Sequence, residues 1–193
     1  MTGMRGITQR DKDIYNFIKQ HGSITVDQCS KIFMTDCKRK YEIACRRLKR
    51  LVECDYIKVS ATKYTHQNVY YIDKKLSFHD LLVIQYCAEL INIGAKNLKL
   101  ERNKQWFEDL ISDGFIYYEI NGQKYINIIE VCFSNKNVKT DYYDELYETN
   151  LLQSNLGIEP KLVIISEFNE NYTSKKIPII TFDFKFKNLF KIL

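Results

Sequence analysis

The stretch CRRLKRLVECDYIKV, residues Cys45 to Val59, places four basic residues within positions 46–50 and then changes to a strand-like pattern. Only Leu48 interrupts the positive charges. Such a run is either the solvated face of an ordinary helix or one edge of a DNA-reading surface. The segments that flank it decide between these two interpretations.

Three helices are expected around this stretch. Thr8–Asp11 and Thr25–Gln28 have the spacing of a capping box, in which two residues satisfy the free amides of a helix start. Helices are therefore expected from these boxes to about residue 21 and to about residue 33. Asp36 is expected to cap a third helix that runs to about residue 55. The apolar stripe of that third helix consists of Tyr41, Ala44, Leu48, Leu51 and Val52.

A β-hairpin is expected directly after the third helix. YIKVS (56–60) and NVYYI (68–72) are rich in β-branched and aromatic residues, and a polar loop separates them. Three short helices closed by a hairpin predict a winged helix-turn-helix, whose third helix enters the major groove of DNA. The alternative is a winged helix that contacts protein, with solvated arginines.

The basic residues outside the apolar stripe define the expected DNA interface. Residues near the start of a recognition helix reach base edges, and those further along touch phosphates. Lys38 and Lys40 are expected in the first turn, where cations oppose the helix dipole and favour function over stability. The expected DNA-binding residues are Lys38, Arg39, Lys40, Tyr41, Arg46, Arg47, Arg50, Lys63, His66 and Gln67.

Charge and composition support two modules in this chain of 193 residues. Residues 1–75 hold 16 Lys and Arg against 8 Asp and Glu, whereas residues 76–193 hold 13 against 16. The basic part favours a polyanionic partner. No membrane span and no signal-peptide pattern is expected. Six cysteines without a CxxC spacing indicate reduced thiols and a cytoplasmic location. Phosphate-loop, dinucleotide and zinc motifs are lacking, so no cofactor is expected.

The second module, residues 76–193, is expected to be a small α/β domain. A capping-box spacing at Ser77–Asp80 opens an apolar helix over 78–93, and a short strand, NLKLE (97–101), follows. Asn121-Gly122 is the preferred centre of a tight hairpin turn between two strand-forming runs. A tyrosine-rich helix over 140–155 and strands over 161–166 and 177–184 complete the order α-β-β-β-α-β-β. The fold class is therefore mixed, α+β.

This order resembles the core of the PD-(D/E)xK nuclease superfamily. The resemblance implies that Asp113 and Glu130 bind a divalent metal such as Mg²⁺, while Cys132 occupies the lysine position. A neutral thiol does not stabilise phosphoryl charge as an ammonium does, so we expect no catalytic residues and no metal site. Under the nuclease alternative the set is Asp113, Glu130 and Lys124, with Lys124 acting from another position of the strand.

The whole arrangement is also similar to the replication-relaxation family of plasmid and phage proteins. The matching segments include ITQRDKDIYNFIKQHGSITVDQCSKIF, RRLKRLVECDYI, FHDLLV and SDGFIYYEINGQKYINIIEV. This resemblance implies a winged helix paired with a nuclease-like domain, in DNA transactions of mobile elements.

The expected function is double-stranded DNA binding in replication, transfer or transcriptional control of a mobile element. The second module is expected to form a homodimer or to dock a protein, with the helix over 78–93 and Tyr142, Tyr143 and Tyr147 as interface material. The alternatives are a metal-dependent nuclease and an inhibitor of a host defence nuclease, whose basic module grips protein or guide RNA.

Overall fold

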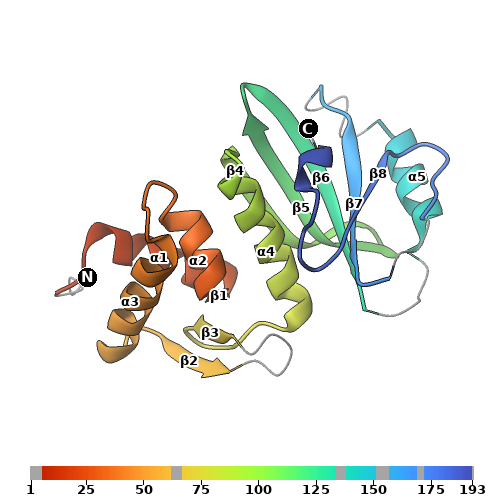
Figure 1. Cartoon of the computed structure of the whole chain (residues 1–193). Helices are drawn as coiled ribbons and strands as arrows, with labels where there is room; N and C mark the ends of the chain where they lie inside the picture. Colours follow the sequence, from red (N-terminus) through yellow and green to blue (C-terminus); the bar gives the residue numbers. More distant parts are fainter. Residues whose placement is uncertain (1–5, 62–66, 134–137, 151–156, 169–171, 193) are drawn as a thin grey trace. The chain divides into compact units, whose positions relative to one another are not determined.

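The computed structural model describes residues 6–61, 67–133, 138–150, 157–168 and 172–192. The chain divides into two compact units, Met1–Ala88 and Glu89–Leu193, each containing helices and strands (Figure 1). The expected mixed α+β class is therefore confirmed. The division falls within a helix, after residue 88, rather than at residue 75, where the sequence suggested it.

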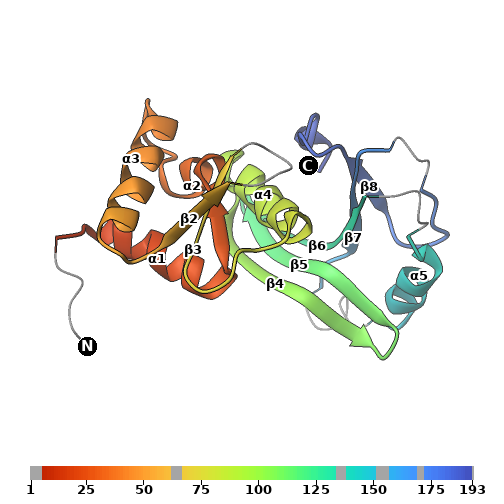
Figure 2. The same ribbon diagram turned by 90° about the horizontal axis from the view of Figure 1, so that it is seen from below.

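The first unit combines helices with a three-stranded antiparallel sheet. Its strands lie in the order β1-β3-β2, so the last strand is central (Figure 1). Figure 2 shows β2 and β3 as neighbours. No strand was expected at β1, which has three residues and lies between two helices. The elements are α1 (Gln9–His21), β1 (Ser23–Thr25), α2 (Val26–Phe33), α3 (Lys40–Glu53), β2 (Lys58–Ala61) and β3 (Asn68–Tyr71).

Both predicted capping boxes are confirmed. The Thr8 side chain accepts a hydrogen bond from the Asp11 amide at 3.3 Å, and the Asp11 carboxylate accepts one from the Thr8 amide at 2.8 Å. Thr25 and Gln28 make the same reciprocal pair, at 3.3 Å and 2.9 Å. At the other end of α1, Gly22 has a φ of +94°, which favours glycine, and its amide bonds the Ile18 carbonyl at 2.7 Å.

The start of α3 differs from the sequence expectation. The helix begins at Lys40, and Arg39, at the N-cap position, makes no side-chain capping bond. Asp36 lies in a turn before it, where the Cys37 amide bonds the Met34 carbonyl at 3.0 Å. The expected cap at Asp36 is therefore wrong, because residues 35–39 form turns and the helix begins only at Lys40. Lys38 precedes the helix and does not lie in its first turn.

Helix α3 packs against the core of the first unit with one of its sides. The fully buried residues of α3 are Ala44, Leu48 and Leu51, as the stripe predicted, but Tyr41 is 50% exposed. A charged contact adds to this packing, since the Arg47 guanidinium donates to the Asp11 carboxylate at 3.1 Å and to the Thr8 hydroxyl at 3.3 Å. The Asp11 side chain is 1% exposed, so this contact lies inside the unit.

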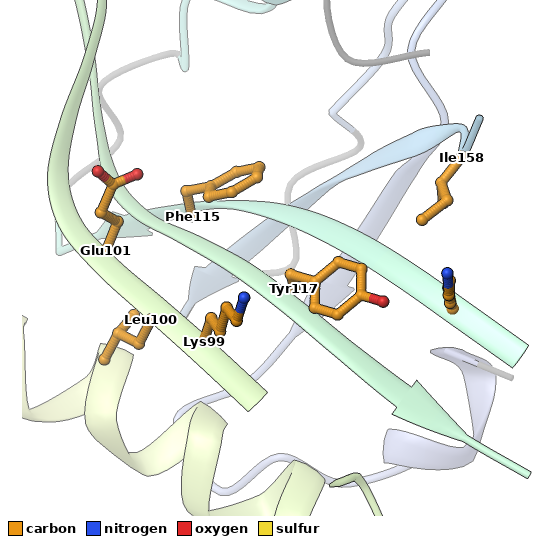
Figure 3. Close-up of a pocket in the computed structure, with 7 residues that line it drawn as sticks. Lys99, Leu100, Glu101, Phe115, Tyr117 and Ile158 are labelled. Carbon is orange, nitrogen blue, oxygen red and sulfur yellow. The ribbon is translucent and has the colours of Figure 1, made fainter. Parts of the chain in front are cut away.

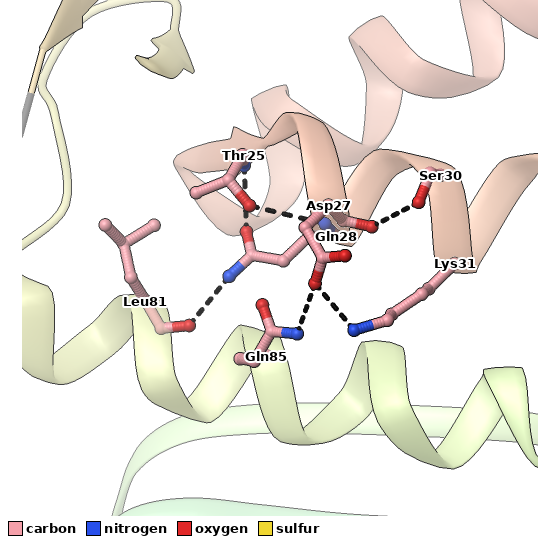
Figure 4. Close-up of polar contacts among 7 residues, drawn as sticks. All are labelled: Thr25, Asp27, Gln28, Ser30, Lys31, Leu81 and Gln85. Atoms are coloured by element: carbon pink, nitrogen blue, oxygen red, sulfur yellow. Dashed lines mark hydrogen bonds and ion pairs between the residues drawn. The ribbon is translucent and has the colours of Figure 1, made fainter. Parts of the chain in front are cut away.

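The beginning of α4 (Phe78–Asn92) packs on α2 within the first unit (Figure 4). The Gln28 side-chain amide donates to the Leu81 carbonyl at 2.8 Å, and Gln85 donates to the Asp27 carboxylate at 2.7 Å. Lys31 also bonds Asp27, at 2.6 Å. The expected start is confirmed, because the Ser77 hydroxyl accepts from the Asp80 amide at 3.1 Å. The contacts with α2 therefore place the first turns of α4 in the first unit.

The second unit contains a five-stranded sheet in the order β4-β5-β6-β7-β8. The first three strands form an antiparallel meander, and β6, β7 and β8 are parallel (Figure 1). The elements follow in the expected order, although β4 is longer than NLKLE and α5 ends before residue 155. They are β4 (Lys96–Phe107), β5 (Leu110–Ile120), β6 (Gln123–Cys132), α5 (Thr140–Glu148), β7 (Pro160–Ser166) and β8 (Ile179–Phe182), followed by a 3-10 turn at Leu189–Ile192.

The hairpin between β5 and β6 is as predicted. Asn121 and Gly122 have φ values of +52° and +81°, and Ile120 pairs with Gln123. Positive φ at both central residues is the type I′ geometry that matches strand twist. This turn sets the register of β5 against β6, and thereby places the polar residues of both strands.

Helix α5 packs in the core of the second unit, and one of its carboxylates binds the loop before β8. Tyr143 and Leu146 are buried in the core of the second unit. Asp144 accepts hydrogen bonds from the Ser174 hydroxyl at 2.5 Å and from three amides of residues 175–177 at 2.9–3.1 Å. Burial alone would raise the pKa of Asp144, but these hydrogen bonds outweigh it and lower that pKa. The ionised carboxylate therefore anchors the loop before β8.

We predict that Arg47→Ala lowers the free energy of unfolding by about 1–3 kcal/mol, because it leaves the buried Asp11 carboxylate without its cation. The adjacent Arg46→Ala removes the same charge from an exposed position and should change it by less than about 0.5 kcal/mol. Urea denaturation of the full chain measures both. Equal effects of the two substitutions would contradict the structural role of Arg47.

Candidate functional site

The outward side of α3 carries a group of exposed cations. Ala44, Leu48 and Leu51 face the core, so the positions between them in the helical repeat face solvent. We call this group the α3 basic face. It consists of Arg46, Lys49 and Arg50 on the helix and of Lys38 and Arg39 directly before it, all exposed. Three of the four charges in the basic run at 46–50 are therefore exposed to solvent, and Arg47 is directed to the interior of the unit.

The α3 basic face is little neutralised by its own chain. Arg39 lies 3.8 Å from Glu42 and Lys49 lies 3.8 Å from Glu53, with all four side chains at least 53% exposed. Such surface pairs contribute little, so they leave these cations accessible to a ligand. Arg46 and Arg50 make no ion pair within the part of the chain that the structure describes. The face therefore presents net positive charge.

Tyr41 lies in the first turn of α3 and is half exposed. Partial burial, followed by the neighbouring Cys45 and Asp27, raises the pKa of its hydroxyl. The hydroxyl therefore remains protonated at neutral pH and is able to donate a hydrogen bond. A neutral donor next to exposed cations suits an anionic partner.

The expected DNA-binding residues are distributed unevenly. Most of them are exposed: Lys38, Arg39, Tyr41, Arg46, Arg50 and Gln67, the last directly before β3. Lys40 is partly buried. Lys63 and His66 lie outside the described residues. The sequence interpretation omitted Lys49, although its three-residue spacing from Arg46 already placed it on the same helical side. It also omitted Lys58, which is exposed on β2.

The two acidic residues of the nuclease-like pattern lie together in the second unit. Gly114 on β5 pairs with Ile129 on β6, which sets Asp113 and Glu130 at adjoining positions of the two strands. The Asp113 carboxylate accepts a hydrogen bond from the Val131 amide at 2.7 Å. Glu130 accepts one from the hydroxyl of Tyr143, a residue that is 1% exposed. Hydrogen bonds from the protein thus hold both carboxylates.

Tyr143 is the common neighbour of this acidic pair. Burial first, then the charge of Glu130 and its hydrogen bond, and then Asp113 and Cys132 raise the pKa of the Tyr143 hydroxyl. The hydroxyl stays protonated and donates to Glu130. The structure therefore gathers the three positions of the nuclease-like pattern around a tyrosine. Among the described residues, no group of three or more His, Cys, Asp or Glu is arranged to hold a metal ion.

Lys124 is not part of this group. It precedes Glu130 by six residues on the same strand, which separates their Cα atoms by about 20 Å. Lys124 instead pairs across the sheet with Glu119, near the hairpin turn. Hydrogen bonds from Asn97 and Tyr117, with a smaller effect of Lys124, lower the pKa of Glu119. The nuclease alternative required Lys124 beside the acids, and the structure does not bring it there.

The surfaces expected to form a homodimer are mostly occupied. Leu81–Ile84, Tyr86–Ala88 and Leu90 of α4 are buried, and so is Tyr143 of α5. Tyr142 and Tyr147 are partly buried. The homodimer stays a prediction.

No family model, curated protein or solved structure matches this chain. The similarity to the replication-relaxation family therefore stays a prediction. Within the described segments, no helix has both the length and the apolar character to cross a bilayer.

We predict that Glu130 and Tyr143 are energetically coupled. Glu130→Ala and Tyr143→Phe should each lower the free energy of unfolding by about 1–3 kcal/mol, because each leaves a partner without its hydrogen bond. The double variant should cost less than the sum, with a coupling energy of about 0.5–3 kcal/mol. Glu145→Ala, at an exposed position of α5, is the control. Additive effects in urea denaturation would contradict the contact.

Proposed function

We propose that the first unit is a winged helix-turn-helix that binds double-stranded DNA through α3. The observation that carries this proposal is the α3 basic face, whose cations lie on the side of the helix opposite the buried residues. A helix needs only a core-facing stripe to be stable, so the concentration of cations on its other side favours a polyanionic partner.

The order of elements supports the same proposal. Helices α1, α2 and α3 and the antiparallel sheet β1-β3-β2 follow one another as in a winged helix, with the β2–β3 hairpin as the wing. In this class α3 lies in the major groove, and its N-terminal residues meet base edges. Arg39 and Lys40 are then the base-reading residues, and Arg46, Lys49 and Arg50 contact phosphates further along.

The broader role follows from this activity by analogy. We propose that the protein acts in replication, transfer or transcriptional control of a mobile element, as the resemblance of its sequence implies. The second unit then serves as a platform for a protein partner or a second copy.

A second candidate function is nuclease activity, which the adjoining carboxylates of Asp113 and Glu130 favour. Two carboxylates attract Mg²⁺ weakly, since hard cations need only oxygen ligands. The position that would hold an ammonium is Cys132. We therefore place this candidate second.

We predict that the full chain binds duplex DNA with an affinity that falls steeply with salt, as counterions are released. Arg46→Ala should weaken all duplexes alike and reduce the salt slope by about 1. Arg39→Ala should instead reduce discrimination at one base position, by about 1–3 kcal/mol. Selection from a randomised duplex library, followed by fluorescence anisotropy, measures these effects.

The matched control for this experiment is Lys19→Ala, an exposed cation at the end of α1. It removes the same charge from another side of the unit and should leave DNA affinity nearly unchanged. Absence of duplex binding at about 50 mM salt, where electrostatic contacts are strong, would end the proposal. Equal losses in Lys19→Ala and Arg46→Ala would point to non-specific attraction.

We predict that the protein leaves supercoiled plasmid intact in Mg²⁺ or Mn²⁺. Loss of one charge-stabilising donor typically costs about 10²–10³ in rate, and Lys124 is too distant to replace it. Gel analysis of the plasmid over time tests this. Metal-dependent nicking that disappears in both Asp113→Ala and Glu130→Gln would establish the second candidate instead.

A further inference from the structure

The second unit contains a groove of about 540 Å³ that has no part in the sites above (Figure 3). Its volume lies within the range of ligand-binding pockets. Strands β4, β5 and β6 form most of it. The lining residues are Lys99, Leu100, Glu101, Phe115, Tyr117, Lys124 and Ile158.

Strand register explains why these side chains meet. Lys99 pairs with Tyr117, and Glu101 pairs with Phe115, across β4 and β5. Since side chains alternate along a strand, Phe115 and Tyr117 emerge on the same face. The Tyr117 hydroxyl donates to Glu119 at 2.9 Å, which fixes the direction of its ring. Figure 3 shows Phe115 and Tyr117 following one another along β5.

Two lysines give the groove its charge. Lys99 comes from β4 and Lys124 from β6, on either side of the β5 aromatic residues. Glu101 also lines the groove, and its carboxylate lies 2.7 Å from the ammonium of Lys104. Lys99 makes no ion pair within the segments that the structure describes. Lys124 has Glu119 as its cross-strand neighbour, so among the described residues Lys99 is the cation of the two without an acidic partner. The groove thus joins an aromatic wall to cations.

We propose that this groove binds a nucleotide unit, with the base against Tyr117 and the phosphate between Lys99 and Lys124. Aromatic rings bind bases through their faces without regard to sequence, and cations alongside follow the phosphates. The chemistry is shared by free nucleotides and by unpaired nucleotides in a single strand. An acidic peptide would satisfy the lysines but would leave the aromatic wall without a flat partner.

Trp106 provides an intrinsic probe for this binding. It is the only tryptophan in the chain, and its ring lies 5.3 Å from that of Phe115. The test is a titration of the full chain with oligothymidylate, thymidine monophosphate or polyglutamate, followed by Trp106 emission. Anisotropy of a labelled oligothymidylate gives the affinity.

The variants separate stacking from charge. Tyr117→Ala should weaken oligothymidylate binding by about 5- to 100-fold, whereas Tyr117→Phe keeps the ring and should retain most of it. Lys99→Glu should also weaken binding, and it keeps the test decisive if Tyr117→Ala does not fold. Lys187→Ala removes an exposed lysine of the same unit that does not line the groove, and should have no effect.

Competition by thymidine monophosphate would identify the free nucleotide as a source, and binding of oligothymidylate alone would identify the single strand. The proposal is overturned if neither ligand binds, if Lys99→Glu binds like the wild type, or if polyglutamate competes equally well. The duplex affinity of α3 is measured separately with Arg46→Ala. Loss of either activity therefore leaves the other interpretable.

Discussion

The carboxylate of Asp11 accepts hydrogen bonds from the Thr8 amide and hydroxyl, both at 2.8 Å, and from the Arg47 guanidinium at 3.1 Å. It therefore closes the start of α1 and ties that helix to α3 at the same point. The carboxylate is almost fully buried, and a buried charge is costly unless it is paired. A rotation of α3 that removed Arg47 from Asp11 would leave this carboxylate without its cation. The contact and the buried stripe of Ala44, Leu48 and Leu51 therefore fix together which side of α3 faces inward.

The division of the basic run follows from that constraint. Arg47 is directed at Asp11, and Leu48 lies in the core. The remaining charges of the run are therefore exposed to solvent: Arg46, Lys49 and Arg50. A second carboxylate, that of Asp27, acts similarly on α2, where it accepts bonds from Lys31 and from Gln85 of α4. Both acidic side chains are used inside the first unit. The cations left outside are consequently opposed by few charges of their own chain.

Local sequence patterns predicted the features that depend on a few neighbouring residues. The capping boxes at Thr8 and Thr25 and the Asn121-Gly122 turn are confirmed because the two or four residues involved supply every partner. The start of α3 and the role of Arg47 were missed. The start of α3 is set by a turn in which the Cys37 amide bonds the Met34 carbonyl, in place of a cap at Asp36. Arg47 meets Asp11 across 36 residues, a separation that no helical repeat reveals. Lys124 and Glu130 were expected on one strand, and β6 confirms it, so their separation of six residues already implied about 20 Å between their Cα atoms.

The sheet of the second unit carries two groups of charged residues in different surroundings. Near the end of β6, Asp113 and Glu130 are turned to protein donors, the Val131 amide and the Tyr143 hydroxyl, and α5 covers this region with Tyr143 and Leu146. Near the hairpin turn, Lys99 and Lys124 border an open groove with Tyr117 between them. A carboxylate within an apolar strand requires a donor, whereas a lysine extends its charge to solvent on an apolar stem. The acids therefore contribute to the fold, and the lysines remain accessible to a ligand.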